Sequence, residues 1–257
     1  MQNPQNIVIT GASSGIGKAL AIAYSKQAVN LFLGARNLDK LQEVKQICQE
    51  LNSQINVFCS KIDVKDEQKM LNWISEIEQK FQIDLVIANA GISAGTASGT
   101  ESSQQIKEIF AVNVDGVLNT INPTILKMKE RKKGQIAIIS SLAGFRGLPS
   151  SPAYSASKAA VRVYGEALRG NLASFGIEVS VICPGYIKTP MTDVNEFPMP
   201  FLMKPEICAK KIINGLRKNK SRISFPFPLF FTVWFCTLLT NRITDPIFAK
   251  LPAKKSL

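Results

Sequence analysis

The sequence predicts an α/β fold, a doubly wound parallel sheet of about seven strands with helices on both faces. Short apolar runs alternate with longer segments in which apolar residues recur at helical spacing. The runs are apolar throughout, which is typical of parallel strands that are covered on both faces. A glycine-rich turn joins the first run to the first helical segment, as expected of the first strand-to-helix connection in this fold.

Each predicted strand is a short apolar run that ends at a turn or a polar residue. The first run, residues 6–10, leads directly into Gly11. We predict strands over residues 6–10, 30–34, 55–63, 83–89, 134–140, 178–183 and 223–225.

The segments between these strands carry apolar residues at the spacing of amphipathic helices. We predict helices from the glycine-rich turn to about residue 27, and over 38–51, 67–81, 102–113 with a continuation toward 128, 154–175 and 205–218. The pattern continues to residue 225 without a repeat or a linker. We therefore predict one domain over residues 1–225 and a C-terminal extension over residues 226–257.

The composition favours a folded core and excludes several classes of site. Of 257 residues, 46% are hydrophobic and 19% are charged, which argues against disorder. The chain has no histidine, which excludes hydrolases that use histidine as the base. Its five cysteines are scattered, so we predict neither a metal site nor a disulfide framework. The polar N-terminus lacks an apolar signal segment, and we expect a cytoplasmic protein.

The formal net charge of +12 indicates an anionic partner. Nucleic acid, an anionic membrane face and an anionic cofactor are the candidates. The basic residues are not interleaved with aromatic residues as they are in nucleic-acid-binding modules. We therefore predict no nucleic-acid binding, and the cofactor and the membrane remain.

The glycine-rich turn, residues 10–17, predicts a dinucleotide site. Its glycines let the backbone turn sharply and approach a pyrophosphate, and the following helix offers free N–H groups and partial positive charge. The residues expected to contact the cofactor here are Gly11, Ser13, Ser14, Gly15, Ile16 and Gly17.

The end of the second strand indicates which dinucleotide binds. NAD enzymes usually carry an acid there, which holds the ribose 2′-hydroxyl group. This chain has Arg36 instead and no acid before Asp39. A guanidinium group suits a 2′-phosphate, so we predict NADP, with a surface arginine that merely caps the strand as the alternative.

Tyr154 and Lys158 are four residues apart, which places both side chains on one face of a helix. An ammonium group beside a phenol favours the phenolate, so we expect a lowered pKa for Tyr154. A phenol of this kind can pass a proton to or from a substrate oxygen. The alternative is a chance pair on a solvated helix.

The chain resembles the short-chain dehydrogenase/reductase family, in segments that keep the order and spacing of that family over about residues 6–225. The resemblance implies a Rossmann fold and a nicotinamide-dependent oxidoreductase. The matching segments are residues 10–17, 63–64, 89–91, 113–114, 140–144, 154–158 and 184–185, followed by Thr189.

The resemblance implies four catalytic residues. Tyr154 is expected as the general acid or base, and Lys158 as the residue that lowers its pKa and binds the nicotinamide ribose. Ser141 is expected to hold the substrate oxygen, whereas the neighbouring Ser140 should point away because side chains alternate along a strand. Asn113 is expected to anchor a water that links Lys158 to solvent.

The resemblance also implies the remaining cofactor contacts, with residues 63–64 at the adenine, 89–91 beside the cofactor and 184–189 over the nicotinamide. These residues are Arg36, Asp63, Val64, Asn89, Ala90, Gly91, Tyr154, Lys158, Pro184, Gly185, Ile187 and Thr189.

The function we expect is NADP-dependent transfer of hydride to or from a carbonyl or alcohol carbon of a lipophilic substrate, such as a ketone or a 3-oxoacyl, steroid-like or sphingoid-like compound. Residues 191–204 are rich in Met, Pro and Phe and are expected to form an apolar lid. The resemblance implies a homo-oligomer. A catalytically idle, cofactor-binding scaffold and a reductase inside a larger lipid-synthesis assembly are the alternatives.

The C-terminal extension departs from the family pattern. Residues 223–241 carry no charge, and basic residues flank them. Three interpretations stay open: packing over the substrate pocket or a partner subunit, attachment to a membrane interface through residues 226–241, and a single membrane span. The two prolines near the start of the stretch leave a helix of only about a dozen residues.

Overall fold

The computed structural model describes residues 3–27, 29–97, 99–250, 252 and 254. Their centre is one seven-stranded sheet in the order β3-β2-β1-β4-β5-β6-β7, and all of its neighbouring strands are parallel. This order confirms the predicted doubly wound sheet. The strands are β1 (Asn6–Thr10), β2 (Asn30–Ala35), β3 (Asn56–Lys61), β4 (Leu85–Ala88), β5 (Gly134–Ile139), β6 (Ile177–Pro184) and β7 (Arg222–Phe225).

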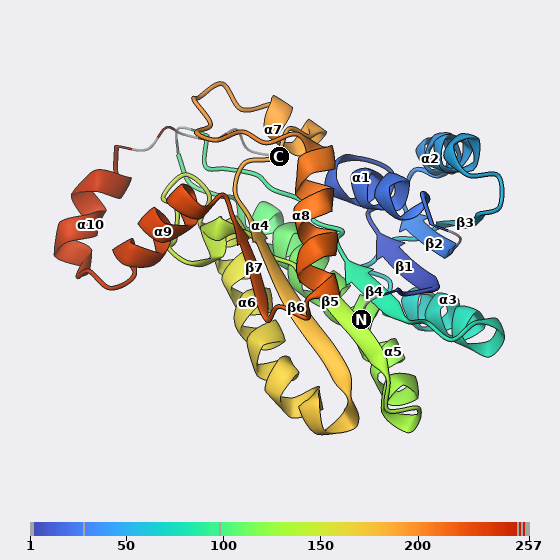
Figure 1. Ribbon diagram of the computed structural model, residues 1–257. Coiled ribbons are helices and arrows are strands. Elements are labelled where there is room, and N and C mark those ends of the chain that lie inside the picture. The colour runs from blue at the N-terminus through green and yellow to red at the C-terminus, as the bar shows by residue number, and fades with distance from the viewer. Residues whose placement is uncertain (1–2, 28, 98, 251, 253, 255–257) are drawn as a thin grey trace.

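Helices cover both faces of the sheet (Figure 1). One buried cluster joins α1, α2 and α8 to the sheet, and a second joins α3, α5 and α6 to the opposite face. The helices are α1 (Gly15–Tyr24), α2 (Leu38–Leu51), α3 (Glu67–Lys80), α4 (Ser103–Phe110), α5 (Gly116–Glu130), α6 (Pro152–Leu172), α7 (Pro190–Asp193), α8 (Pro205–Arg217), α9 (Phe227–Cys236) and α10 (Asn241–Phe248).

Local capping explains where several helices begin. The Asn37 side chain accepts a hydrogen bond from the N–H group of Lys40 at the start of α2, and Asp66 does the same for Lys69 at α3. Such caps satisfy N–H groups that have no partner within the helix. The predicted bounds of α2 agree with the structure.

The long helix predicted from residue 102 toward 128 is interrupted. A π-helical turn over Ala111–Asp115 separates α4 from α5 and contains Asn113. Such turns are rare and occur frequently at functional sites. Periodicity alone does not reveal them, because apolar residues on either side keep nearly the same spacing.

The C-terminal extension forms two helices beyond β7 (Figure 1). Leu229 and Phe230 of α9 pack on a buried cluster that contains Leu142, and the Phe230 ring meets Phe145 edge to face at 5.6 Å. Asp245 of α10 forms an ion pair with Arg146 at 2.6 Å. In the part of the chain that the structure describes, no helix has both the length and the apolar character that crossing a membrane requires.

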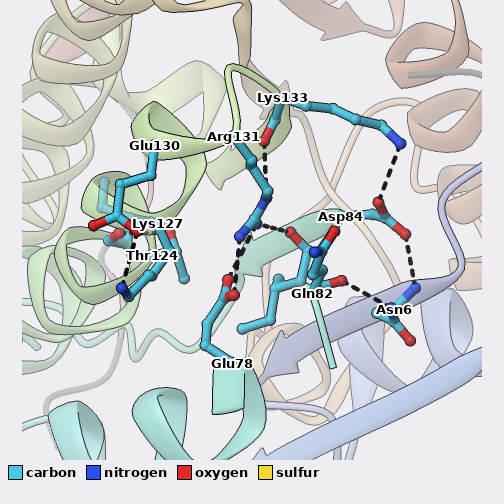
Figure 2. A network of polar contacts seen from close by, with 11 residues as sticks. Asn6, Glu78, Gln82, Asp84, Thr124, Lys127, Glu130, Arg131 and Lys133 are labelled. Atoms are coloured by element: carbon cyan, nitrogen blue, oxygen red, sulfur yellow. Dashed lines mark hydrogen bonds and ion pairs between the residues drawn. The ribbon is translucent and has the colours of Figure 1, made fainter. Parts of the chain in front are cut away.

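A polar network joins the amino ends of the strands, at the edge of the sheet opposite their carboxyl ends (Figure 2). Arg131, after α5, donates two hydrogen bonds to Glu78 of α3 at 2.9 and 3.1 Å, and a third to the carbonyl oxygen of Ile83. The N–H group of Asn6 donates to Asp84 at 3.1 Å. The Glu78 carboxylate is buried, and Arg131 pairs with it there.

We predict that Arg131→Ala lowers the free energy of unfolding by about 3 kcal/mol, because it leaves the buried Glu78 charge without a partner. Urea denaturation measures this change. Lys127→Ala is the matched control, since the Lys127–Glu130 pair is exposed and contributes at most about 1 kcal/mol. Equal losses in the two variants would contradict the role of Arg131.

Candidate active site

A cleft of about 370 Å³ opens at the carboxyl ends of the strands, where the strand order reverses between β1 and β4. It is lined by most of the residues that the sequence singled out. These are Gly11, Ser13, Ser14, Gly15, Ile16, Arg36, Asp63, Val64, Asn89, Ala90, Gly91, Ser141, Tyr154, Lys158, Pro184, Gly185, Ile187 and Thr189.

The glycine-rich turn forms one end of the cleft. Gly11 and Gly15 have φ values of +65° and +54°, a conformation that glycine adopts without strain. Gly17 lies behind the turn, and a Cβ there would collide with the Gly11 carbonyl and approach Asn89 Nδ2 to 2.6 Å. Gly17 is buried and does not line the cleft, so it serves close packing of helix and strand. The Ser14 side chain does not cap α1, which leaves the first N–H groups of α1 to a ligand.

Asn89 fixes the shape of this turn. Its side-chain amide donates hydrogen bonds to the carbonyl oxygens of Thr10 and Gly11 at 2.9 and 3.2 Å. The Thr10 hydroxyl accepts from the N–H groups of Asn89 and Ala90 at 3.2 and 3.3 Å. The ends of β1 and β4 are therefore tied together directly beneath the cleft.

The other end of the cleft is lined by Arg36, Asn37 and Lys40, with Asp63 and Val64 beside them. Arg36 and Lys40 are both exposed, and no carboxylate occupies the position directly after β2. Two cations at this place fit a 2′-phosphate group. The sequence analysis missed Lys40, although its position in the first turn of α2, four residues after Arg36, was a usable signal.

Tyr154 and Ser141 come together at the inner wall of the cleft. The Ser141 hydroxyl lies close enough to the Tyr154 hydroxyl to lower the pKa of the phenol. Ser141 Oγ also accepts from the N–H group of Ala143 at 3.1 Å, which fixes its position. Ser140 points elsewhere, since its hydroxyl donates to the carbonyl oxygen of Lys158 at 2.7 Å.

The predicted effect of Lys158 on Tyr154 is wrong for this structure. Burial raises the pKa of Tyr154, and the Ser141 hydroxyl only partly opposes that rise. The Lys158 ammonium lies 5.9 Å from the centroid of the Tyr154 ring and donates to the carbonyl oxygen of Ile139 at 3.0 Å. Burial also lowers the pKa of Lys158 to about 8, because no carboxylate among the described residues pairs with it.

Asn113 is buried in the π-helical turn and does not line the cleft. Its side chain accepts from the N–H group of Ile92 at 2.8 Å and donates to the Ile92 carbonyl at 2.9 Å and the Ser157 hydroxyl at 3.0 Å. Asn113 therefore holds the segment after β4 against α6. Asn113 Oδ1 and Lys158 Nζ both lie beside Gly91. A Cβ added to Gly91 would be 3.2 Å from the first atom and 3.3 Å from the second, so the two side chains are neighbours.

The segment after β6 forms the remaining wall. Thr189 faces the glycine-rich turn, and a Cβ on Gly15 would lie 3.0 Å from Thr189 Cγ2. The N–H group of Thr189 donates to the Thr192 hydroxyl at 2.9 Å, within a capping box that begins α7. Gly185 lies against Leu229 of α9, so the C-terminal extension supports this wall from outside.

The structure adds two residues beside Tyr154 that the sequence analysis missed, Ser93 and Lys254. Lys254 Nζ donates to Ser93 Oγ at 2.6 Å and lies 5.6 Å from the centroid of the Tyr154 ring. They are 161 positions apart, so no local pattern could have paired them.

The arrangement as a whole fits a dinucleotide with a reacting group at its inner end. The cleft offers glycines where a backbone must approach a phosphate, free N–H groups at α1, and a phenol beside a serine hydroxyl. Within the described residues no group of acidic, cysteine or histidine side chains could hold a metal ion.

Comparison with known proteins places these features in one family. The sequence pattern described as short chain dehydrogenase matches residues 5–197. An uncharacterized oxidoreductase of Myxococcus xanthus is 34% identical over 245 residues, which cover 95% of this chain and 96% of that protein. The 3-ketodihydrosphingosine reductase of Mus musculus is 32% identical over 222 residues, 81% of this chain and 67% of that protein. The crystal structure of a 3-oxoacyl-[acyl-carrier protein] reductase with bound NAD from Brucella melitensis is similar with a TM-score of 0.74 and 27% identity, covering 86% of this chain and 87% of that one.

Proposed function

Because the chain belongs to the short-chain dehydrogenase family and is an oxidoreductase, we propose that it transfers hydride between NADP and a carbonyl or alcohol carbon of a lipophilic substrate. The observation that carries this proposal is the meeting of the Tyr154 and Ser141 hydroxyl groups in the cleft that the glycine-rich turn lines. The nicotinamide, when bound, supplies the hydride chemistry. The residues of the chain hold the cofactor, orient the substrate and move the proton.

In carbonyl reduction, Tyr154 donates its phenolic proton to the substrate oxygen as the neighbouring carbon gains the hydride. The Ser141 hydroxyl donates a hydrogen bond to the same oxygen and holds it in place. Burial raises the pKa of Tyr154, so the phenol keeps its proton at neutral pH and is in the form that a general acid needs. Lys158, one turn later on α6 and lining the same cleft, would bind the nicotinamide ribose. Alcohol oxidation reverses these steps, with the phenolate as the base.

The preference for NADP over NAD rests on the two cations after β2. Arg36 presents a planar fork of donors that can bind a 2′-phosphate at two oxygens, and Lys40 adds a second positive charge. NAD binding would favour a carboxylate directly after the strand, and this chain has none there. A preference for NADP in turn favours the reductive direction.

The lipophilic character of the substrate rests on the segments around the cleft. Met191 lines the cleft, and Phe201 and Leu202 in the same segment are exposed. The Mus musculus relative is by its name a 3-ketodihydrosphingosine reductase, which supports an apolar substrate here. We also propose a homo-oligomer that pairs through α4, α5 and α6, because Ile106, Leu126 and Val163 on these helices are exposed. Sedimentation as a monomer at micromolar concentration would exclude it.

An idle scaffold that holds a partner through the extension is the alternative. Asn113, Ser141, Tyr154 and Lys158 are all present, and three of them line the cleft. A protein that only binds the cofactor and a partner would not need all four of these residues. Binding of NADPH without turnover of any ketone or aldehyde would favour the scaffold.

The outer face of α9 and the neighbouring face of α10, which we call the apolar face, fits contact with an anionic membrane surface. It presents exposed Phe227, Phe231, Phe235, Leu238 and Ile247. The first four lie in the uncharged stretch over residues 223–241, which Arg222 and Arg242 flank, and Ile247 follows beyond Asp245 and before Lys250. Apolar aromatics bordered by cations are the pattern of interfacial segments.

We predict that Tyr154→Phe lowers turnover at least about a hundredfold, because no group remains to donate the proton. NADPH binding should stay within about twofold, since the ring is kept. Loss of NADPH absorbance with ketones and aldehydes of rising chain length measures turnover, and quenching of protein fluorescence measures binding. Tyr164→Phe, on the exposed side of α6, is the control and should retain full activity. Turnover by Tyr154→Phe above a few per cent would remove Tyr154 from its role.

We predict that Arg36→Asp lowers the ratio of kcat/KM for NADPH to that for NADH at least about tenfold, because a charge-assisted pair with the 2′-phosphate is lost and a carboxylate repels it. Initial rates with each cofactor measure the ratio. Arg242→Asp makes the same charge change on the exposed surface of α10 and should leave the ratio unchanged. An unchanged ratio in Arg36→Asp would mean that Arg36 only caps the strand.

We predict that the full-length protein sediments with vesicles of anionic phospholipid and that Phe231→Ser/Phe235→Ser abolishes this binding while leaving activity intact. Both side chains are exposed on the apolar face, so their loss removes apolar area from the membrane contact. Leu71→Ser, at an exposed position of α3, is the matched control. Wild-type protein that stays in the supernatant would exclude the membrane contact, and a variant that changes only the oligomeric state would assign the face to a second subunit.

A further inference from the structure

Lys254 lies beside the candidate active site and is held there by its backbone. The carbonyl oxygen of Lys254 accepts a hydrogen bond from the N–H group of Ala97 at 2.7 Å. Gly95 packs directly on Lys254, and a Cβ at Gly95 would collide with its backbone. Ala97 adopts a φ of +53°, a conformation that costs a non-glycine residue free energy. The loop after β4 is thus shaped to seat this residue.

The Lys254 side chain extends from this seat toward the reacting phenol. Its ammonium group donates to Ser93 Oγ at 2.6 Å and lies over the Tyr154 ring, 5.6 Å from the centroid. The contact with the ring partly stabilises the cation. Lys158 Nζ lies 5.9 Å from the same centroid and donates a hydrogen bond to the Ile139 carbonyl oxygen. Of the two ammonium groups near Tyr154, Lys254 is the one that comes from outside the catalytic helix.

The charge of Lys254 has no counterpart in the described part of the chain. No described carboxylate lies within ion-pair distance of its Nζ, although the residue is partly buried. Burial lowers its pKa to about 8, which shows how weakly the surroundings compensate the ammonium. A buried cation is costly unless an anion pairs with it. A ligand that brings an anion would remove this cost and raise the pKa again.

We propose that Lys254 binds a carboxylate or phosphate group of the substrate, so that the enzyme acts on carbonyl or alcohol compounds that carry such a group a few bonds from the reacting carbon. The Ser93 hydroxyl, which accepts from Lys254, donates a second hydrogen bond to the same anion. The apolar remainder of the substrate contacts the segment over residues 191–204. This inference rests on the proposed function, and it narrows the substrate from lipophilic ketones in general to amphiphilic oxo acids and their phosphate analogues.

The test uses matched substrates with the full-length enzyme. A series of 4-oxo acids of rising chain length is compared with the corresponding methyl esters. Dihydroxyacetone phosphate is compared with dihydroxyacetone. The loss of NADPH absorbance measures the rate in each case. The acid and phosphate members should have kcat/KM at least tenfold above their neutral partners. The pair that shows the larger ratio identifies the anionic group. Equal values within both pairs would overturn the proposal and leave the reductase standing.

Three variants assign the preference to Lys254. Lys254→Met keeps the apolar stem and removes the charge, and it should lower kcat/KM for the acid at least tenfold while the ester changes less than twofold. Lys254→Arg should restore part of the preference. Lys250→Met, exposed on the same segment, is the control. If Lys254→Met lowered kcat/KM equally for the acid and the ester, Lys254 would act on Tyr154 and not on the substrate anion. If it raised kcat/KM equally for both, the Lys254 side chain would obstruct the site. Either result overturns the proposal.

A binding measurement separates this proposal from the proposed function. Calorimetric titration of octanoate and octanol onto the protein in the presence of NADP does not depend on turnover. Octanoate should bind at least tenfold more weakly to Lys254→Met than to wild type, whereas octanol should be unaffected. Octanoate binding that depends on Lys254 in a protein that reduces no ketone would keep this site and remove the reductase function. Octanoate binding that is indifferent to Lys254 would remove the site.

Discussion

The close contact between α6 and the carboxyl end of β5 is the constraint on which the site depends. Gly144 lies against the backbone of Lys158, and a Cβ there would approach it to 2.8 Å. The Ser140 hydroxyl and the Lys158 ammonium each bridge strand and helix, through the carbonyl oxygens of Lys158 and Ile139. Because α6 is fixed at this point, Tyr154, one turn earlier, meets Ser141 at the end of the strand. The phenol is therefore positioned by packing that involves no ligand.

The sheet and its helices could be predicted because their signals are local. Continuous apolar runs and helical spacing are contained in a dozen residues, and the predicted bounds of α2 were correct. The π-helical turn at Ala111–Asp115 was missed because it changes the hydrogen bonding and hardly alters the apolar spacing. The α9 and α10 helices were not delimited because their apolar residues lie on both the packed and the exposed sides.

Some features of the candidate site could likewise be predicted from short motifs, and others could not. The glycine-rich turn, Ser141 and Tyr154 were predicted from short motifs, and the structure gathers them in one cleft. The pKa of Tyr154 could not be predicted, because it depends on burial and on the direction in which the Lys158 ammonium points. Gly17 and Asn113 belong to the motifs and yet support the cleft from behind. Lys254 needs the whole fold to reach Ser93, so only the structure reveals it.

The seating of Lys254 on Gly95 and Ala97 has a practical consequence for anyone who handles this protein. A purification handle or fluorescent fusion attached close behind Lys254 would lie near Tyr154, because the Lys254 ammonium lies over the Tyr154 ring. The described residues before β1 lie at the amino end of that strand, whereas the cleft opens at its carboxyl end. Recombinant versions intended for assays are best extended at the amino end, because a change at Lys254 would remove its contacts with Ser93 and the Tyr154 ring.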